Sequence, residues 1–146
     1  MAADLLRMDD YLAQSLSRSS RANDAAAITR AIDPAVIASL DEAWEEGEAD
    51  LVVELIDLYL GDAPQWVEAM RAAAAGDDVR VLKRAAHTLK GSSGSLGIRQ
   101  VAETCRMLEL SCSESATRVE ELLQQLNREF ATARAALAAE RLRRIA

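Results

Sequence analysis

The spacing of apolar residues constrains the fold of this chain most, because one stretch keeps intervals of three and four residues throughout. Its members are Val79, Leu82, Ala86, Leu89, Ser93 and Leu96. Residues three or four apart lie on one face of an α-helix, so this pattern predicts a helix that buries that face.

Two stretches further along the chain repeat the spacing. Their apolar residues are Ile98, Val101, Cys105, Leu108 and Cys112, and then Val119, Leu122, Leu126, Phe130, Ala133 and Leu137. The second set predicts a long helix. Its basic end, ERLRRIA, is typical of a helix C-terminus, where positive charge is favourable.

Two more helices are predicted upstream. Asp33 before Pro34 is an N-cap followed by proline at the first helical position, which predicts a helix reaching about Gly47. Its expected buried side consists of Val36, Ile37, Leu40 and Trp44. The next helix has expected apolar positions at Leu51, Leu55, Leu58, Trp66 and Met70. Because Pro64 lacks a backbone N–H, we expect a kink or a break in it near Asp62.

The composition agrees with these patterns. Aromatic residues make up 3% of the 146 residues, and the chain has 6 glycines and 2 prolines. We therefore predict an all-α protein, an antiparallel up-and-down four-helix bundle with one or two additional N-terminal helices. Residues 1–31 are expected to form an amphipathic helix (4–17) and a linker, and residues 32–146 the bundle domain. The apolar face of residues 4–17 is expected to cap the bundle, with a dimer contact or a partner helix as alternatives.

Charge and cysteine content exclude several classes of function. The net charge of −7 argues against a nucleic-acid binder. No apolar run approaches the roughly 20 residues of a membrane span, and the acidic N-terminus is unlike a secretory signal, so we expect a cytoplasmic protein. We also expect it to be a monomer. Cys105 and Cys112 are seven apart on one helix, which is too far for a disulfide. A single histidine without a Cys-x-x-Cys pair makes a metal site unexpected.

The chemistry is expected around that histidine, His87. The segment from Arg80 to Gln100 contains no acid, and its basic residues are Arg80, Lys83, Arg84, Lys90 and Arg99. Because the core stripe uses Ala86 and Leu89, the histidine should point about 100° away from the core, into solvent. A neutral imidazole is nucleophilic near pH 7, which favours a phosphoryl-accepting histidine.

Its neighbours on the helix fit that chemistry. Lys90, three residues on, would point the same way and neutralise phosphate oxygens. Gly91 removes the side chain that would otherwise cover the ring, which would let another protein's active site approach. Lys83, Arg84 and Gly94 are candidate docking residues.

The run AAHTLKGSSGSLG, followed by CRMLE, resembles the signature of histidine-containing phosphotransfer (HPt) domains. The stretch ELIDLYLGDAPQWVEAMRAAAAGDD is similar to the second helix of that family. The resemblance covers about residues 34–135 and implies a four-helix bundle that carries phosphate between aspartates of receiver domains. It implies that His87 is phosphorylated, that Lys90 stabilises the phosphate and that Gly91 gives access.

The resemblance also implies the partners, namely response-regulator receiver domains and a hybrid sensor histidine kinase. Mg²⁺ would belong to the receiver's acidic pocket, so no cofactor is expected here. An ATP-dependent kinase is rejected, since such kinases usually place an acid where Thr88 stands and no glycine-rich nucleotide loop is present. An adaptor that binds a receiver without phosphotransfer, and a purely structural bundle, remain as alternatives.

Overall fold

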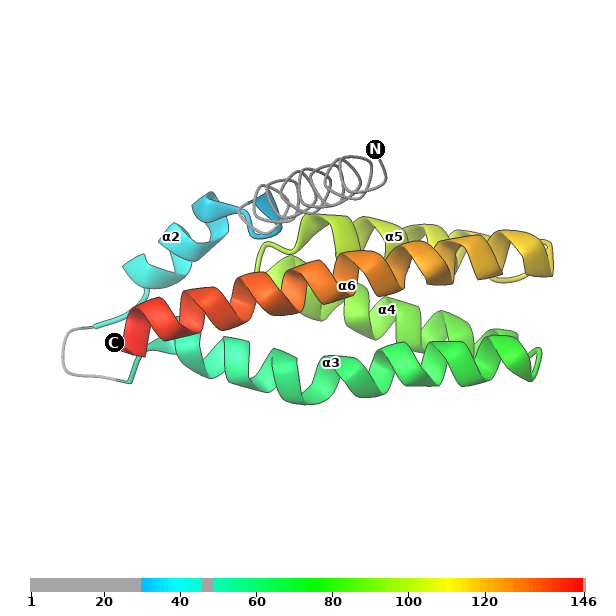
Figure 1. Cartoon of the computed structure of the whole chain (residues 1–146), viewed down its shortest axis with the longest axis horizontal. Coiled ribbons are helices and arrows are strands. Elements are labelled where there is room, and N and C mark those ends of the chain that lie inside the picture. The colour runs from blue at the N-terminus through cyan, green and yellow to red at the C-terminus, as the bar shows by residue number, and fades with distance from the viewer. Residues whose placement is uncertain (1–29, 46–48, 146) are drawn as a thin grey trace, which may run out of the picture.

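The computed structural model describes residues 30–45 and 49–145, and the secondary structure of this part of the chain is helical. The helices are α2 (Pro34–Glu42), α3 (Leu51–Ala75), α4 (Val79–Ser95), α5 (Arg99–Ser111) and α6 (Ala116–Ile145). Figure 1 shows α3 to α6 as a bundle, with α2 beside one end. The predicted all-α bundle with an additional N-terminal helix is confirmed. The expected helix at residues 4–17 and its linker lie outside the described residues.

Short turns join the four long helices, so successive helices run in opposite directions. Each helix packs against the next one in the chain, and α6 closes the bundle against α3. The turn after α3 begins at Gly76, and Asp78 caps α4 by accepting the N–H of Val81 at 3.2 Å. Antiparallel helices joined by short turns bury one apolar face each in a common core.

Most of the predicted core positions are buried. The five apolar positions predicted for α5 and the six predicted for α6 all lie in the core, and so do Leu82, Ala86, Leu89, Ser93 and Leu96. Val79 is an exception, because 39% of its surface remains exposed at the first position of α4. A regular spacing therefore located the buried faces of three helices correctly.

The prediction for α3 is correct at Met70, which is fully buried, and Leu55 and Trp66 pack against the core while partly buried. In the first half of the helix the buried face is shifted by one residue from the predicted one. The core positions are Val52, Ile56 and Tyr59, while Leu58 is 61% exposed. Both sets of positions are apolar, and they differ by about 100° around the helix axis, so their spacing alone does not choose between them. Pro64 does not break α3, which is continuous from Leu51 to Ala75 and only gently bent in Figure 1.

The helix α2 is shorter than predicted. It ends at Glu42 instead of near Gly47, so Trp44 lies beyond it and is 39% exposed instead of buried. Its start is as predicted, because Oδ1 of Asp33 accepts the N–H of Ala35 at 2.9 Å and Pro34 occupies the first turn. Ile37 is its buried residue.

Polar contacts hold both ends of α2 on the bundle. At the start, the N–H of Asp33 donates to the carbonyl of Gly97 at 2.9 Å, and Arg99 pairs with the Asp33 carboxylate. At the other end, the guanidinium of Arg144 binds Asp41 at 2.8 Å and Asp50 at 3.2 Å. These contacts link α2 to the α4–α5 turn, to α6 and to the start of α3.

Two further findings on the described residues concern membrane spans and the two cysteines. No described helix is long and apolar enough to cross a membrane. Cys105 and Cys112 are free and buried, as predicted, and burial raises the pKa of the Cys105 thiol to about 12. A thiol with such a pKa stays protonated and unreactive at neutral pH.

Candidate functional site

His87 lies near the middle of α4 on the face that points away from the core. Its neighbour Ala86 is fully buried, whereas 70% of the His87 side chain is exposed. This difference follows from the helical repeat, since adjacent residues point about 100° apart. The ring is therefore open to a large partner molecule.

A carboxylate from α5 joins the histidine and the lysine. Oε1 of Glu109 lies 3.1 Å from Nδ1 of His87 and 2.9 Å from Nζ of Lys90. Only 15% of the Glu109 side chain is exposed, so its carboxylate is held between α4 and α5. Lys90 is thus placed beside the histidine by an ion pair as well as by its helical spacing.

The electrostatics of the three groups determine the histidine tautomer. Burial alone would raise the pKa of Glu109, but the hydrogen bond and charge of Lys90, together with His87, hold this pKa below its usual value. The carboxylate is therefore ionised near neutral pH and can only accept hydrogen bonds. In the neutral ring the proton then resides on Nδ1, which leaves the lone pair of Nε2 free.

Sequence reasoning did not assign Glu109 a role, although this residue ends the quoted run CRMLE. One feature of the sequence pointed to such a residue. The segment from Arg80 to Gln100 contains five basic residues and no acid, so an acidic side chain that pairs with them has to come from another helix. The spacing along the chain does not identify that helix, because His87 and Glu109 are 22 residues apart.

The glycines near the ring have no packing role inside the chain. A Cβ added at Gly91 or at Gly94 would meet no atom within 4 Å. Glycine in a helix interior is destabilising relative to alanine, so Gly91 lowers the stability of α4 without a compensating internal contact. Because these two glycines have no side chains, the surface directly beside His87 is open.

A basic surface lies on the other side of the ring, towards the start of α4. Arg80, Lys83 and Arg84 are exposed, and no carboxylate of the described residues pairs with any of them. Most arginines of the described residues elsewhere in the bundle are paired with an acid. Lys83 and Arg84, the two charged candidates for docking, and Arg80 beside them are thus available to an external acidic group.

A buried hydrogen bond joins the last turn of α4 to α3. The hydroxyl of Tyr59 lies 2.9 Å from the hydroxyl of Ser93, which is fully buried. Burial raises the pKa of Tyr59 to about 12, so its hydroxyl remains protonated. Because two buried polar groups are paired across the helices, this bond fixes the position of α4 along α3.

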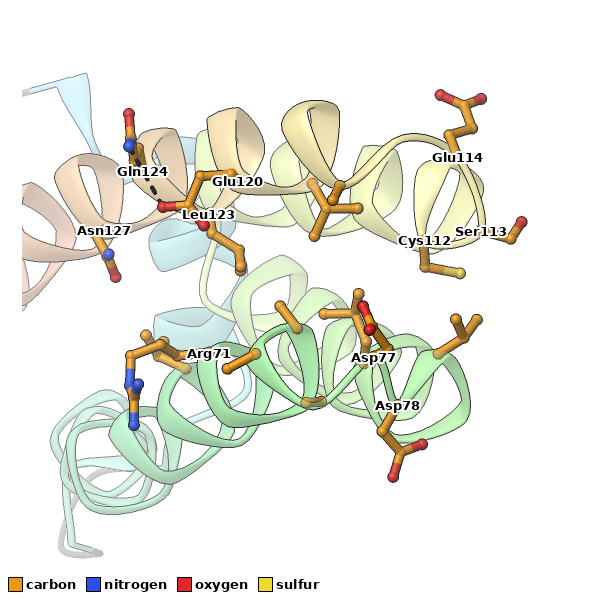
Figure 2. Close-up of a pocket in the computed structure, with 18 residues that line it drawn as sticks. Arg71, Asp77, Asp78, Cys112, Ser113, Glu114, Glu120, Leu123, Gln124 and Asn127 are labelled. Atoms are coloured by element: carbon orange, nitrogen blue, oxygen red, sulfur yellow. Dashed lines mark hydrogen bonds between the residues drawn. The ribbon is translucent and has the colours of Figure 1, made fainter.

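A separate hollow of about 530 Å³ lies at the far end of the bundle, between the α3–α4 turn and the first turns of α6. Figure 2 shows the residues that line it. Asp77, Asp78 and Glu114 lie at its rim, and Leu123 contributes to its apolar wall. His87 does not line this hollow, so the two are separate features. The described residues also contain no group of three or more His, Cys, Asp or Glu side chains arranged to hold a metal ion.

Comparisons with known proteins agree with the helical-bundle fold. The chain resembles, in structure, the histidine-containing phosphotransfer protein B (HptB) of Pseudomonas aeruginosa PAO1, with a TM-score of 0.69 and 32% sequence identity. This match covers 77% of the present chain and 96% of that one.

A similar sequence also occurs in a sensor protein. The chain is 30% identical over 82 residues to the sensor protein GacS of Pseudomonas syringae pv. syringae, and the match spans 9% of that protein's length. The sequence profile of the Hpt domain family matches residues 54–144, which contain α4, α5 and nearly all of α3 and α6. The chain belongs to the Hpt domain family, the histidine phosphotransfer domains of phosphorelays.

Proposed function

We propose that this protein is a phosphorelay intermediate that accepts a phosphoryl group on His87 from a phosphoaspartate of one receiver domain and passes it to another receiver. The observation that carries the proposal is the exposed ring whose Nδ1 is bound by Glu109 and whose flank holds Lys90. A structural bundle without this function would leave these features, and the glycines beside them, unexplained.

Transfer to Nε2 needs no general base. The Nε2 lone pair forms the bond to phosphorus while the bond from phosphorus to the aspartate oxygen breaks, and the aspartate leaves as a carboxylate with the electron pair. The proton on Nδ1 stays in place, so the phosphorylated ring gains positive charge. The Glu109 carboxylate, 3.1 Å away, is positioned to balance this charge. Glu109 is therefore assigned as a positioning residue.

Lys90 would stabilise the transferred phosphoryl group. Its ammonium is bound to Glu109 at 2.9 Å in the present structure, and a rotation of the flexible side chain would bring it to phosphate oxygens. Phosphoryl transfer depends mainly on positioning and charge neutralisation, which fits a site with one mobile cation. Any Mg²⁺ is expected in the acidic pocket of the receiver.

The basic surface would guide the receiver to the ring. Lys83 and Arg84 are unpaired, and they would attract the acidic pocket of a receiver, while Gly91 and Gly94 would let it approach closely. Charge complementarity of this kind raises the rate of encounter more than the final affinity. We expect the exchange to occur in the cytoplasm, where ATP, the original source of the phosphoryl group, is available.

Members of the family carry phosphoryl groups and are not kinases, so this chain should depend on a hybrid sensor kinase for its supply. The test uses a panel of phosphorylated receiver domains with the wild-type protein and with His87→Gln. We expect acid-labile label on the wild type and none on the variant, with unchanged helicity by circular dichroism. Label on both proteins would refute the assignment of His87.

An adaptor that binds a receiver without accepting phosphate would give a different result. Receivers would then bind the wild-type protein, but no label would appear on it with any member of the panel. In that case the affinity should depend on whether the receiver is phosphorylated.

A further inference from the structure

The hollow of about 530 Å³ at the far end of the bundle lies along the groove between α3 and α6. Its apolar walls include Val67 and Ala74 of α3 and Val119 of α6, and Leu123 of α6 faces the α3 wall across it (Figure 2). The volume is within the range of about 300–1,000 Å³ that is typical of clefts that bind ligands. The site around His87 does not use this hollow, so phosphotransfer leaves it unexplained.

The sequence leaves this space open because the last turn of α3 has small side chains. Residues 72–75 are four alanines in succession, and Ala73, Ala74 and Ala75 line the hollow. Val79 lines it as well, which explains why this first residue of the apolar stripe of α4 remains 39% exposed. The apolar stripe of α4 therefore continues past the closed core and ends in the wall of the hollow.

The polar groups of the hollow do not favour a small polar ligand. Among the described residues, no buried side-chain nitrogen or oxygen lacks a hydrogen-bond partner. A pocket for a small polar molecule usually has a few polar groups that converge on the ligand and fix its orientation. An apolar side chain of a partner therefore fits the floor of the hollow better than a polar metabolite does.

The rim of the hollow is acidic. Four acids that line it are exposed, and none of them belongs to an ion pair of the described residues. They are Asp77, Asp78, Glu114 and Glu120. Arg71 also lines the hollow, but its Nε already donates to Oε2 of Glu68 at 2.9 Å. Because the rim carboxylates face solvent without a counter-charge, a complementary partner has basic side chains around its apolar contact.

The hollow and the phosphotransfer site lie on opposite sides of the bundle. Each of the helices α3 to α6 packs against the next, and α6 packs against α3, so the α3–α6 groove is opposite the α4–α5 groove. His87 and Lys90 of α4 and Glu109 of α5 occupy the α4–α5 side. His87 is also eight residues beyond Val79, which is about 12 Å along α4 at 1.5 Å per residue. A receiver on the ring therefore leaves the hollow uncovered.

We propose that this hollow is a second docking surface, which receives a basic amphipathic helix of a partner protein. A helix fits because the groove runs between two antiparallel helices, and a helix in such a groove inserts apolar side chains at intervals of three and four residues. One of these side chains fills the hollow, and basic residues beside it pair with Glu114 and Glu120. This partner holds the protein while the face around His87 stays open to a receiver. The binding itself does not depend on phosphotransfer.

The probe for this surface is an amidated peptide of leucine and lysine, about 14 residues or four helical turns long, with its leucines at helical spacing. A matched peptide has glutamate in place of every lysine. In NMR spectra of the ¹⁵N-labelled full chain, we expect the lysine peptide to shift the amide signals of Ala74, Asp77 and Leu123. Those of His87 and Lys90 should stay unchanged, and the glutamate peptide should shift none of the five.

Three variants, compared by fluorescence anisotropy with a labelled lysine peptide, separate the hollow from the overall negative charge. Glu114→Gln/Glu120→Gln should bind about three- to tenfold more weakly, the effect of losing two exposed charge pairs. Glu42→Gln/Glu54→Gln removes the same charge from exposed acids at the other end of the bundle and should bind within about twofold of wild type. Ala74→Leu fills the hollow and should weaken binding at least about tenfold. If urea unfolding shows that Ala74→Leu does not fold, the two charge variants still decide the proposal.

The outcomes are distinct. Equal weakening in Glu42→Gln/Glu54→Gln, or amide shifts spread over the acidic surface of the bundle, would overturn the docking site, because binding would then follow net charge alone. Equal binding of both peptides would exclude a basic partner. Absence of binding of the lysine peptide at millimolar concentration would refute the proposal as a whole. Amide shifts at the hollow that depend on the concentration of the protein alone would assign this surface to a second copy of the chain instead.

Discussion

Replacing glycine by alanine at two positions of this protein should change its stability in opposite directions. Gly97, in the α4–α5 turn, has a φ of +76°, and an added Cβ would lie 3.0 Å from Cβ of Val36 and 3.1 Å from Cβ of Asp33. Gly91, inside α4, has a helical backbone and free space at the Cβ position. The two substitutions thus test the same chemical change in a constrained and an unconstrained place.

The magnitudes follow from these environments. The left-handed conformation costs a non-glycine residue about 1–2 kcal/mol, and forcing a methyl group against packed neighbours costs about 1–3 kcal/mol. Gly97→Ala should therefore lower the free energy of unfolding by about 2–4 kcal/mol, since α2 can shift and relieve part of the contact. Gly91→Ala should raise it by about 0.5–1 kcal/mol, the usual difference between the two residues inside a helix.

Urea unfolding followed by far-UV circular dichroism measures both effects. A Gly97→Ala variant within about 0.5 kcal/mol of wild type would refute the packing argument, because surface changes without a structural role fall in that range. A destabilised Gly91→Ala variant would show that this glycine has an internal role after all. Gly91→Ala should also accept phosphate from a receiver more slowly despite its greater stability, and an unchanged rate would remove the access role.

Three other residues give independent predictions. Lys90→Ala should slow transfer from a receiver about 10- to 100-fold without unfolding the bundle, as the loss of one charged group at a phosphoryl site does, and single-turnover kinetics would check this. The pKa of Glu109 is lowered in the folded protein, so its ionised form stabilises the fold above the usual pKa of 4.5, and this contribution is lost as the pH falls through the lowered value. The stability difference between wild type and Glu109→Gln should accordingly be constant at neutral pH and disappear in acid; a difference independent of pH would contradict the assignment. Arg144→Gln should cost about 2–3 kcal/mol in urea unfolding, less than for a fully buried pair, because Asp41 and Asp50 keep part of their contact with water.

Local patterns were sufficient for much of the fold. In α4, α5 and α6 apolar residues alternate with polar ones at helical spacing, so only one face can be buried and the sequence indicates which. In α3 the residues around Leu55 and Leu58 are apolar on more than one face. The choice of Tyr59 for the core depends on its buried partner Ser93 and on the ring of Phe130, which lies 6.2 Å from that of Tyr59. Neither contact is visible in the local spacing.

The candidate site likewise combines features that follow from the local sequence with features that depend on tertiary packing. The sequence by itself determined that His87, Lys90 and Gly91 share the outer face of one helix, because positions three and four apart must do so. Only the tertiary structure decided that Glu109 binds both His87 and Lys90, since it depends on how α5 packs against α4. Helical periodicity is a local property of the chain, whereas contacts between helices are set by the packing of the whole bundle.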